Sequence, residues 1–132
     1  MKGSCLCGSV EVVANESSEI GLCHCGMCRR WTGGPFFAVH CDDKVRFSGD
    51  TLKTFRSSEW AERAFCGNCG STLYYRLVPD GEYYVSAGLF QDHVFELASQ
   101  IFIDEKPAFY TLANQTPMLT GQQVFAQFAP DQ

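Results

Sequence analysis

Hydrophobic and polar positions alternate along this chain over short stretches, and turn residues separate the stretches. Alternation with a period of two is typical of β-strands that bury one face. We therefore predict a mainly β fold built from short strands. The predicted strands are residues 9–14, 44–47, 52–56, 71–78, 83–87 and 101–103, and residues 36–41, whose compact apolar run indicates a buried strand.

Two of the turns indicate hairpins. Ser48-Gly49-Asp50 separates the strands predicted at 44–47 and 52–56, which indicates a hairpin of those two strands. Pro79-Asp80-Gly81 indicates a second hairpin, because proline fixes φ and glycine accepts a positive φ. Residues 23–31 show no alternation, so we predict a metal-binding loop and a short helical turn there.

The length and composition favour one domain. The chain has 132 residues, of which 45% are hydrophobic and 14% aromatic, enough to fill a core. No low-complexity segment or long repeat marks a boundary, so we predict a single domain over residues 1–132. We expect the aromatic residues of the strands in the core and sheets, with pocket lining as the alternative. They are Phe36, Phe37, Tyr74, Tyr75, Tyr83 and Tyr84.

The charge balance excludes some classes of partner. A net charge of -5 and a pI near 5.0 argue against nucleic acid or an anionic membrane. No apolar run approaches the ~20 residues that span a bilayer, and the first residues lack the apolar core of a signal peptide. We therefore predict a cytoplasmic protein. Thiols stay reduced in that compartment, so clustered cysteines favour a metal, with disulfide pairing as the alternative.

The cysteines carry the strongest chemical signal. Seven of the eight lie in three clusters, which are Cys5–Cys7, Cys23–Cys28 and Cys66–Cys69. Structural zinc takes four protein ligands, whereas catalytic zinc takes three and keeps one position open. The two paired clusters would complete one closed zinc site, although spacing alone does not exclude another partition. Its four predicted ligands are Cys5, Cys7, Cys66 and Cys69.

The remaining cluster offers Cys23, Cys25 and Cys28, which is the ligand number of an open site. Zinc held there could keep an incoming thiol deprotonated near pH 7, or hold a water or a carbonyl oxygen. The alternative is a site closed by a fourth ligand, for which the candidates are Cys41, His24 and His40. We expect Cys41, which ends an apolar run, to be a buried free thiol.

Charged residues follow the three cysteines directly. Arg29 and Arg30 are candidates for binding a substrate carboxylate, which the planar guanidinium suits. The alternative is a solvated charge pair beside a core Trp31. We expect the His24 side chain to point away from the metal and to support the ligands or line a pocket. His40 and His93 are expected to be ordinary strand-end or surface histidines.

Three motifs together resemble the glutathione-dependent formaldehyde-activating enzyme family, whose domain centromere protein V shares. They are residues 3–8 (GSCLCG), residues 23–29 (CHCGMCR) with Gly33 and Phe36 following, and residues 65–71 (FCGNCGS). Residues 101–110 look like the family's late segment. The resemblance implies a β-tent of small twisted antiparallel sheets pinned by zinc. It also implies two zinc ions, structural at the four paired cysteines and catalytic at Cys23, Cys25 and Cys28.

The resemblance further implies a zinc-dependent carbon–sulfur lyase that forms or cleaves S-(hydroxymethyl)glutathione, or a related small-thiol adduct. Its substrates would be glutathione and formaldehyde, with Arg29, Arg30 and His24 as expected substrate-binding residues. The alternative is a non-catalytic, zinc-stabilised module that binds or carries a thiol, a metal or a protein partner. The two hypotheses differ in whether an added thiol reaches the metal. A nucleic-acid-binding zinc ribbon is disfavoured because a basic face is missing.

Overall fold

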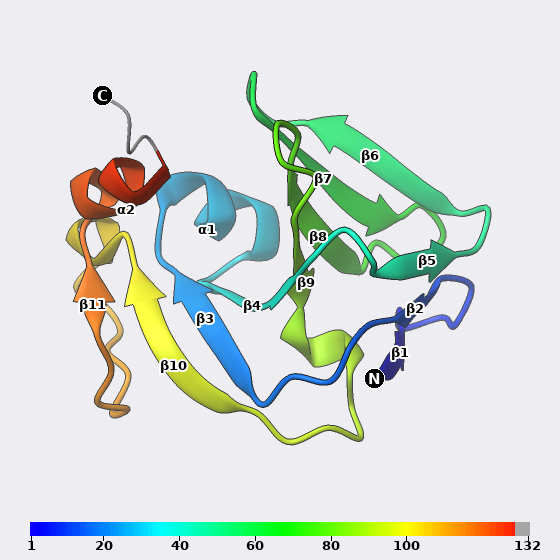
Figure 1. The fold of residues 1–132 in the computed structure, drawn as a ribbon, viewed down its shortest axis with the longest axis horizontal. Coiled ribbons are helices and arrows are strands. Elements are labelled where there is room, and N and C mark those ends of the chain that lie inside the picture. Colours follow the sequence, from blue (N-terminus) through cyan, green and yellow to red (C-terminus); the bar gives the residue numbers. More distant parts are fainter. Residues whose placement is uncertain (129–132) are drawn as a thin grey trace. The chain divides into compact units, whose positions relative to one another are not determined.

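The computed structural model describes residues 1–128 and divides into two compact units (Figure 1). The first unit consists of Met1–Ser18 and Ala38–Phe95, and the second of Glu19–Phe37 and the residues from Glu96 onward. Both units are therefore discontinuous in sequence. The prediction of a single domain over residues 1–132 stays a prediction, and residues 129–132 lie outside the described part.

A small antiparallel sheet begins the first unit. Its strand order is β1-β2-β5, with β1 at Lys2–Ser4, β2 at Glu11–Val13 and β5 at Arg46–Ser48. Val12 at the centre of β2 pairs with strands on both sides and is buried. The alternation in the sequence therefore turns one face of β2 toward the core.

A second antiparallel arrangement forms most of the first unit, in the order β4-β9-β8-β7-β6. Its strands are β4 (Phe36–Cys41), β6 (Leu52–Arg56), β7 (Ala61–Cys66), β8 (Thr72–Leu77) and β9 (Tyr83–Ser86), and the 3-10 turn η1 (Ala87–Leu89) follows β9. Val39, Val85, Tyr74 and Ala64 are cross-strand neighbours and all are buried. This row forms the centre of the core.

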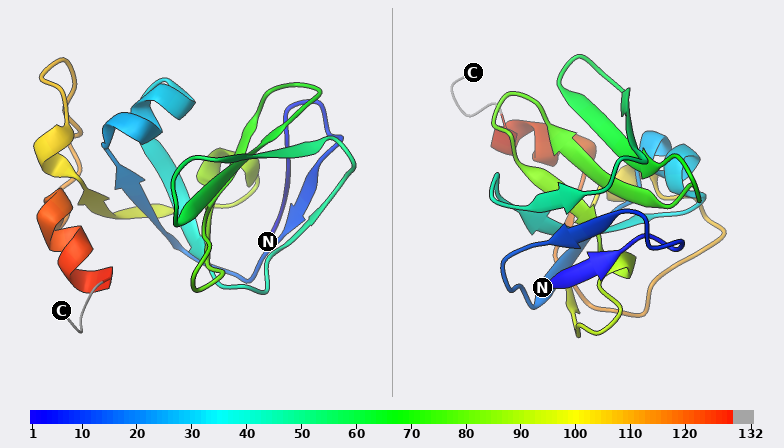
Figure 2. Two further views of the ribbon diagram at one scale, coloured as in Figure 1. Left: turned by 90° about the horizontal axis from the view of Figure 1, so that it is seen from above. Right: turned by 90° about the vertical axis from the view of Figure 1, so that its right-hand side faces the viewer.

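The second unit is built around parallel strands. β10 (Glu96–Ile101) pairs in parallel with β3 (Glu19–Cys23) and with β11 (Met118–Leu119), and the arrows of the three strands point the same way in Figure 1, with further views in Figure 2. Its helices are α1 (Gly26–Thr32), the 3-10 turn η2 (Ile103–Glu105) and α2 (Gly121–Phe128). The register puts Cys23 opposite Ile101, so both strands end at the same edge. None of the helices in residues 1–128 is long and apolar enough to cross a membrane.

The predicted mainly β class is confirmed, with eleven strands and two short α-helices in residues 1–128. Strands occupy 36–41 and 52–56 as predicted, and the 79–81 turn joins β8 to β9 in a hairpin. The short helical turn predicted within 23–31 is α1. The antiparallel pairing that the resemblance implies holds in the first unit, whereas β10 in the second unit is paired in parallel.

The hairpin predicted at Ser48-Gly49-Asp50 is wrong. β5 pairs with β2 and β6 pairs with β7, so the turn leads from one sheet to another. Core packing favours the pairing of β5 with β2, because the ring centre of Phe47 on β5 lies 4.8 Å from the ring centre of the buried Tyr74. The strand predicted at 101–103 is displaced, because β10 ends at Ile101 and residues 103–105 form η2.

Candidate metal centres

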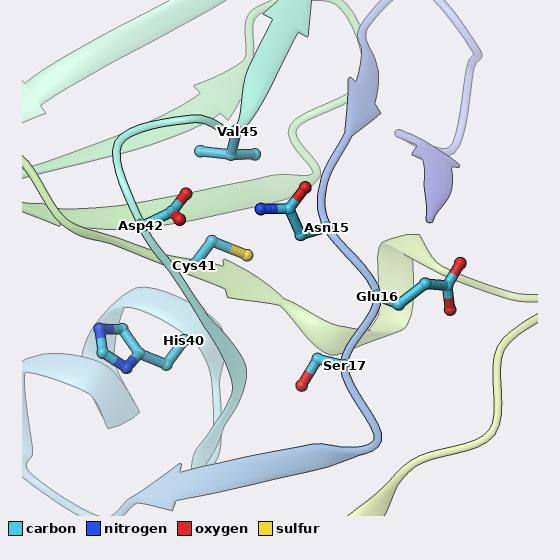
Figure 3. A pocket seen from close by; sticks show the side chains of 7 residues that line it. All are labelled: Asn15, Glu16, Ser17, His40, Cys41, Asp42 and Val45. Carbon is cyan, nitrogen blue, oxygen red and sulfur yellow. The ribbon is translucent and has the colours of Figure 1, made fainter.

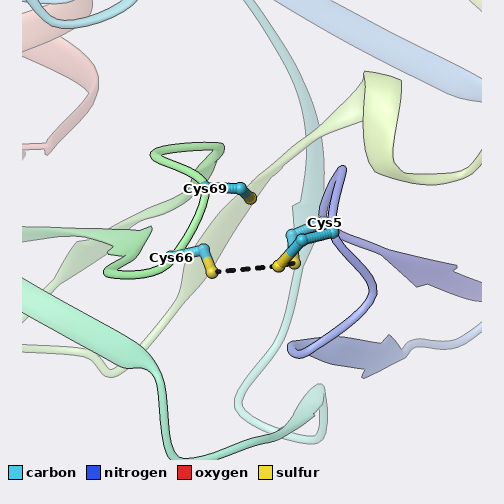
Figure 4. Close-up of side chains that lie close together, drawn as sticks. Cys5, Cys66 and Cys69 are labelled. Carbon is cyan, nitrogen blue, oxygen red and sulfur yellow. Dashed lines mark hydrogen bonds between the residues drawn. The ribbon is translucent and has the colours of Figure 1, made fainter.

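Four sulfur atoms meet in the first unit from segments far apart in the sequence. The ligand atoms of Cys5, Cys7, Cys66 and Cys69 all lie within 4.8 Å of one another, and we call this group the four-cysteine cluster. Figure 4 shows Cys66 at the end of β7, Cys69 on the loop that follows and Cys5 on the loop between β1 and β2, with their side chains converging. The structure thus brings together the four residues predicted for a closed zinc site.

The sulfur separations suit zinc. The Cys5 and Cys7 sulfurs are 3.6 Å apart, and those of Cys7 and Cys66 are 3.8 Å apart. A tetrahedral ion with Zn–S bonds of about 2.3 Å needs sulfurs roughly 3.8 Å apart. The residues present therefore fit a closed tetrathiolate site.

Tight turns place these sulfurs. In the loop between β7 and β8, the Gly70 N–H donates to the Cys66 carbonyl at 2.7 Å, and Gly70 has φ of 82°, in the left-handed region. A positive φ is easily reached only by glycine, which explains the residue after Cys69. The Leu6 N–H donates to the Ser71 hydroxyl at 3.1 Å and joins the two cysteine loops.

Hydroxyl groups next to the sulfurs favour thiolates. The Ser9 hydroxyl lies 3.0 Å from the Cys7 sulfur and 3.4 Å from the Cys66 sulfur. Ser9, followed by Thr51, lowers the pKa of Cys66 to about 5, and Ser9 with Asn68 lowers the pKa of Cys7 to about 7. Burial instead raises the pKa of Cys5. Two of the four thiols are thus prepared to bind a cation.

The second unit contains the other group, which we call the three-cysteine cluster. Its sulfurs, on Cys23, Cys25 and Cys28, also lie within 4.8 Å of one another. Cys23 ends β3, Cys25 is the N-cap of α1, and Cys28 lies in the first turn of that helix. The Cys25 sulfur accepts a hydrogen bond from the Cys28 N–H at 3.3 Å. A strand end, a cap and a helical turn therefore direct three sulfurs to one point.

Crowding defines the electrostatics of this cluster. Hydrogen bonds with Cys25 and then Cys28, together with burial, raise the pKa of Cys23. Three thiolates this close repel one another, so they need a cation to be ionised together. The donor set is soft and threefold, which fits zinc with a position left for another ligand.

The predicted substrate residues lie in different surroundings. Arg29 is partly buried, and its Nε donates to the His24 carbonyl at 3.0 Å. Arg30 is exposed on α1. His24 is 0% exposed, and its ring nitrogens lie 2.7 Å from the Tyr110 hydroxyl and 2.8 Å from Gln100 Oε1. This geometry gives no support to direct substrate contact by His24.

The other two candidates for a fourth ligand, Cys41 and His40, belong to the first unit, as does His93. Cys41 is buried, and its pKa is raised to about 11 by burial and then by Asp42, so it is a protonated thiol at neutral pH. It borders a cavity of about 90 Å³, shown in Figure 3, which Asn15 lines from the other side. His40 lies 3.3 Å from a Glu82 carboxylate oxygen and stacks on Tyr84. His93 lies 2.7 Å from the Ser17 carbonyl oxygen.

Sequence reasoning missed the residues that surround the sulfurs. Tyr110 and Gln100 bind His24, and the Glu105 carboxylate accepts the Gly26 N–H at 3.0 Å where α1 begins. Ser9 and Thr51 serve the four-cysteine cluster. Tyr110, Gln100 and Glu105 carry no spacing signal, because they reach the segment of the three-cysteine cluster through tertiary structure.

Comparison with known proteins agrees with the motifs. The sequence model of the glutathione-dependent formaldehyde-activating enzyme family matches residues 1–105. An uncharacterized lyase of Schizosaccharomyces pombe is 37% identical over 127 residues, covering 93% of each chain. A Halomonas elongata protein, provisionally named a glutathione-dependent formaldehyde-activating enzyme, is 28% identical over 85 residues, covering 56% of this chain and 54% of its own.

A solved structure resembles the fold. The crystal structure of a Rhodobacter sphaeroides protein superposes with a TM-score of 0.59, covering 89% of this chain and 99% of its own. At 20% identity this likeness concerns the fold alone.

Proposed function

The chain belongs to the glutathione-dependent formaldehyde-activating enzyme family, and from that premise we propose that it is a zinc-dependent carbon–sulfur lyase. The proposed reaction joins the thiol sulfur of glutathione, or of a related small thiol, to the carbon of formaldehyde. The carbon–sulfur bond forms as the thiol proton passes to the carbonyl oxygen, giving S-(hydroxymethyl)glutathione. The reverse reaction breaks that bond and returns both substrates.

The difference in ligand number between the two clusters carries this proposal. The four-cysteine cluster offers a full tetrahedral set, whereas the three-cysteine cluster offers one ligand fewer. We assign structural zinc to the first and catalytic zinc to the second. Zinc bound by three thiolates would hold an added thiol as thiolate and bring it close to the aldehyde.

The chain's own residues would hold and orient the substrates. Cys23, Cys25 and Cys28 provide the metal ligands. Arg29 lies beside the cysteine loop through its bond to the His24 carbonyl, and Arg30 is exposed on the same helix. We assign both arginines to the carboxylates of glutathione, because a guanidinium pairs with a carboxylate through two parallel hydrogen bonds. The cytoplasmic location also remains a proposal, and it agrees with the absence of disulfide bonds among the eight cysteines, all of which lie in residues 1–128.

Two measurements on Cys25→Ser test the proposal. Native mass spectrometry should find two zinc ions and a glutathione adduct in the wild type, and one zinc ion without the adduct in Cys25→Ser. Exchange between free and adducted glutathione, followed by NMR at equilibrium, should exceed the uncatalysed rate only in the wild type. Cys41→Ser is the matched control, because Cys41 is outside both clusters, and it should keep two zinc ions and full activity.

The outcomes separate the hypotheses. Unchanged exchange in folded Cys25→Ser would reject the lyase assignment. Thiol uptake without faster exchange would favour a carrier. Two zinc ions without thiol uptake would indicate a closed second site. Arg30→Gln should raise the KM for glutathione about fivefold while leaving the zinc content unchanged, since an exposed carboxylate contact contributes roughly 1 kcal/mol.

A further inference from the structure

His24 is held on every side although it lies between two cysteines of the three-cysteine cluster. Its N–H donates to the Ile101 carbonyl at 3.1 Å, and its carbonyl accepts from Arg29 at 3.0 Å. Its two ring nitrogens bond Tyr110 and Gln100 at 2.7 and 2.8 Å. All four polar atoms of a fully buried residue are therefore bonded, which fixes the backbone on which Cys23 and Cys25 stand.

The donor and acceptor of each of these hydrogen bonds can be assigned by starting from Thr116, which bonds Gln100. The Thr116 hydroxyl donates to the Pro117 carbonyl at 3.1 Å, so it accepts from the Gln100 amide nitrogen at 3.2 Å. The Gln100 side-chain oxygen therefore faces His24 and accepts a hydrogen bond from the His24 Nε2–H. Nδ1 is left as an acceptor for the Tyr110 hydroxyl. The chain of bonds therefore sets one orientation of the imidazole and one tautomer.

Tyr110 is itself fixed by a closed loop. The Lys106 ammonium donates to the carbonyls of Pro107, at 3.0 Å, and Tyr110, and to the Thr111 hydroxyl at 3.3 Å. It also lies 5.2 Å from the centre of the Tyr110 ring. The phenol is thus presented to His24 by a loop that a single lysine holds together.

We propose that His24, Tyr110 and Gln100 form a hydrogen-bonded tether that positions Cys23 and Cys25 for metal binding at the three-cysteine cluster. The inference rests on the zinc site of the proposed function, but it concerns metal binding and not turnover. The tether fixes the cysteine loop before an ion arrives, so less conformational entropy is lost on binding. His24 is then a positioning residue and makes no contact with the substrate. Tyr110 lies beyond residues 1–105, which match the family.

The test compares zinc affinities in the full chain. Competition with chelators of graded strength should resolve two zinc ions, and the one that disappears in Cys25→Ser belongs to the three-cysteine cluster. Tyr110→Phe removes only a hydroxyl and should weaken that zinc about tenfold, the lower end of the loss seen when groups that support metal ligands are removed. Gln100→Leu should act in the same direction. The other zinc should keep its affinity.

Spectroscopy adds a readout that general destabilisation would not change. In Co²⁺-substituted protein, Tyr110→Phe should shift the d–d and thiolate-to-metal bands that Cys25→Ser abolishes. Tyr84→Phe, a tyrosine of the first unit, is the matched control and should leave those bands unchanged. If Tyr110 acts through His24, the losses of zinc affinity in His24→Leu and in Tyr110→Phe will not add in the double variant.

Each outcome decides the inference. Wild-type zinc affinity and cobalt bands in folded Tyr110→Phe and Gln100→Leu would overturn the tether, as would additive losses. A wild type that takes up only one zinc ion would overturn both the tether and the proposed function. A tenfold weaker zinc in Tyr110→Phe, found in a protein without lyase activity, would support the tether while rejecting the proposed function.

Discussion

The two cysteine clusters use the same ligand atom but differ in how the chain brings the sulfurs together. The four-cysteine cluster joins segments 59 positions apart, as the contact of Cys7 with Cys66 shows. The three-cysteine cluster draws all its sulfurs from residues 23–28, and Gln100 and Tyr110 hold His24 in the middle of that segment. An ion in the first would cross-link the fold, whereas an ion in the second would occupy a loop that the fold already holds. Ligand type therefore indicates the metal, and chain separation indicates its role.

The largest expected effect tests the cross-linking role. Cys66→Ser should remove the structural zinc and unfold the first unit, because such ions contribute about 10–16 kcal/mol, comparable to the whole stability of a domain. Far-UV circular dichroism and thermal melting would detect the loss. Cys41→Ser, at a buried thiol outside the cluster, should melt cooperatively near the wild type. A folded Cys66→Ser with an unchanged Tm would contradict the structural assignment.

Graded chelation tests the same difference without mutation. A chelator should remove the three-cysteine zinc first, since that site has one ligand fewer. The Tm should fall only slightly at this stage and collapse when the second zinc leaves. Zinc content by native mass spectrometry and Tm measured on the same samples provide the check. A collapse of Tm with the first zinc would reverse the assigned roles.

A pair of glycines gives a matched, smaller perturbation of each cluster. Gly33, the C-cap of α1, has φ of 86°, Gly70 beside Cys69 has φ of 82°, and a Cβ at either would meet nothing within 4 Å. Alanine there costs conformational energy alone, about 1 kcal/mol. Gly70→Ala should lower the Tm by roughly 3–5 °C, whereas Gly33→Ala should mainly weaken the three-cysteine zinc.

Gly88→Ala is the control for both variants, because a Cβ at Gly88 also meets nothing within 4 Å and φ there is not in the left-handed region. Its Tm and zinc affinities should stay at wild-type values. If Gly33→Ala and Gly70→Ala weakened zinc binding at the three-cysteine cluster equally, the two clusters would not be independent as proposed.

The smallest expected effect is the alkaline stability of the first unit. Burial, followed by Tyr83 and Glu62, raises the pKa of Tyr74 to about 12. A folded pKa above the unfolded value of about 10 gives stability that is fully present below pH 10 and is lost as the pH rises through 12. The wild type should lose about 1 kcal/mol over this interval through Tyr74, after allowance for solvent screening. Urea melts at pH 9, 10 and 11 should show a shallower decline in Tyr74→Phe.

The sequence by itself determined the positions of several short strands and the grouping of seven cysteines into three clusters. Strands occupy residues 36–41 and 52–56 as predicted, and the glycines within and after Cys66–Cys69 allow the tight turn that brings the two sulfurs together. These features are local, so neighbouring residues decide them. The prediction of a closed and an open site depended on ligand number alone, and the structure collects the sulfurs into groups of four and three.

Tertiary structure decided what depends on partners distant in the chain. The pairing of β5 with β2 was fixed by core packing, which overrode the turn at Ser48-Gly49-Asp50. β10 could not be recognised from alternation of polar and apolar residues, because it is paired in parallel on both sides. His24 was visible as a residue between two clustered cysteines, but its proposed role depends on Tyr110 and Gln100, 86 and 76 positions away. A hydrogen bond between such distant residues leaves no periodicity in either segment, so only the folded chain reveals it.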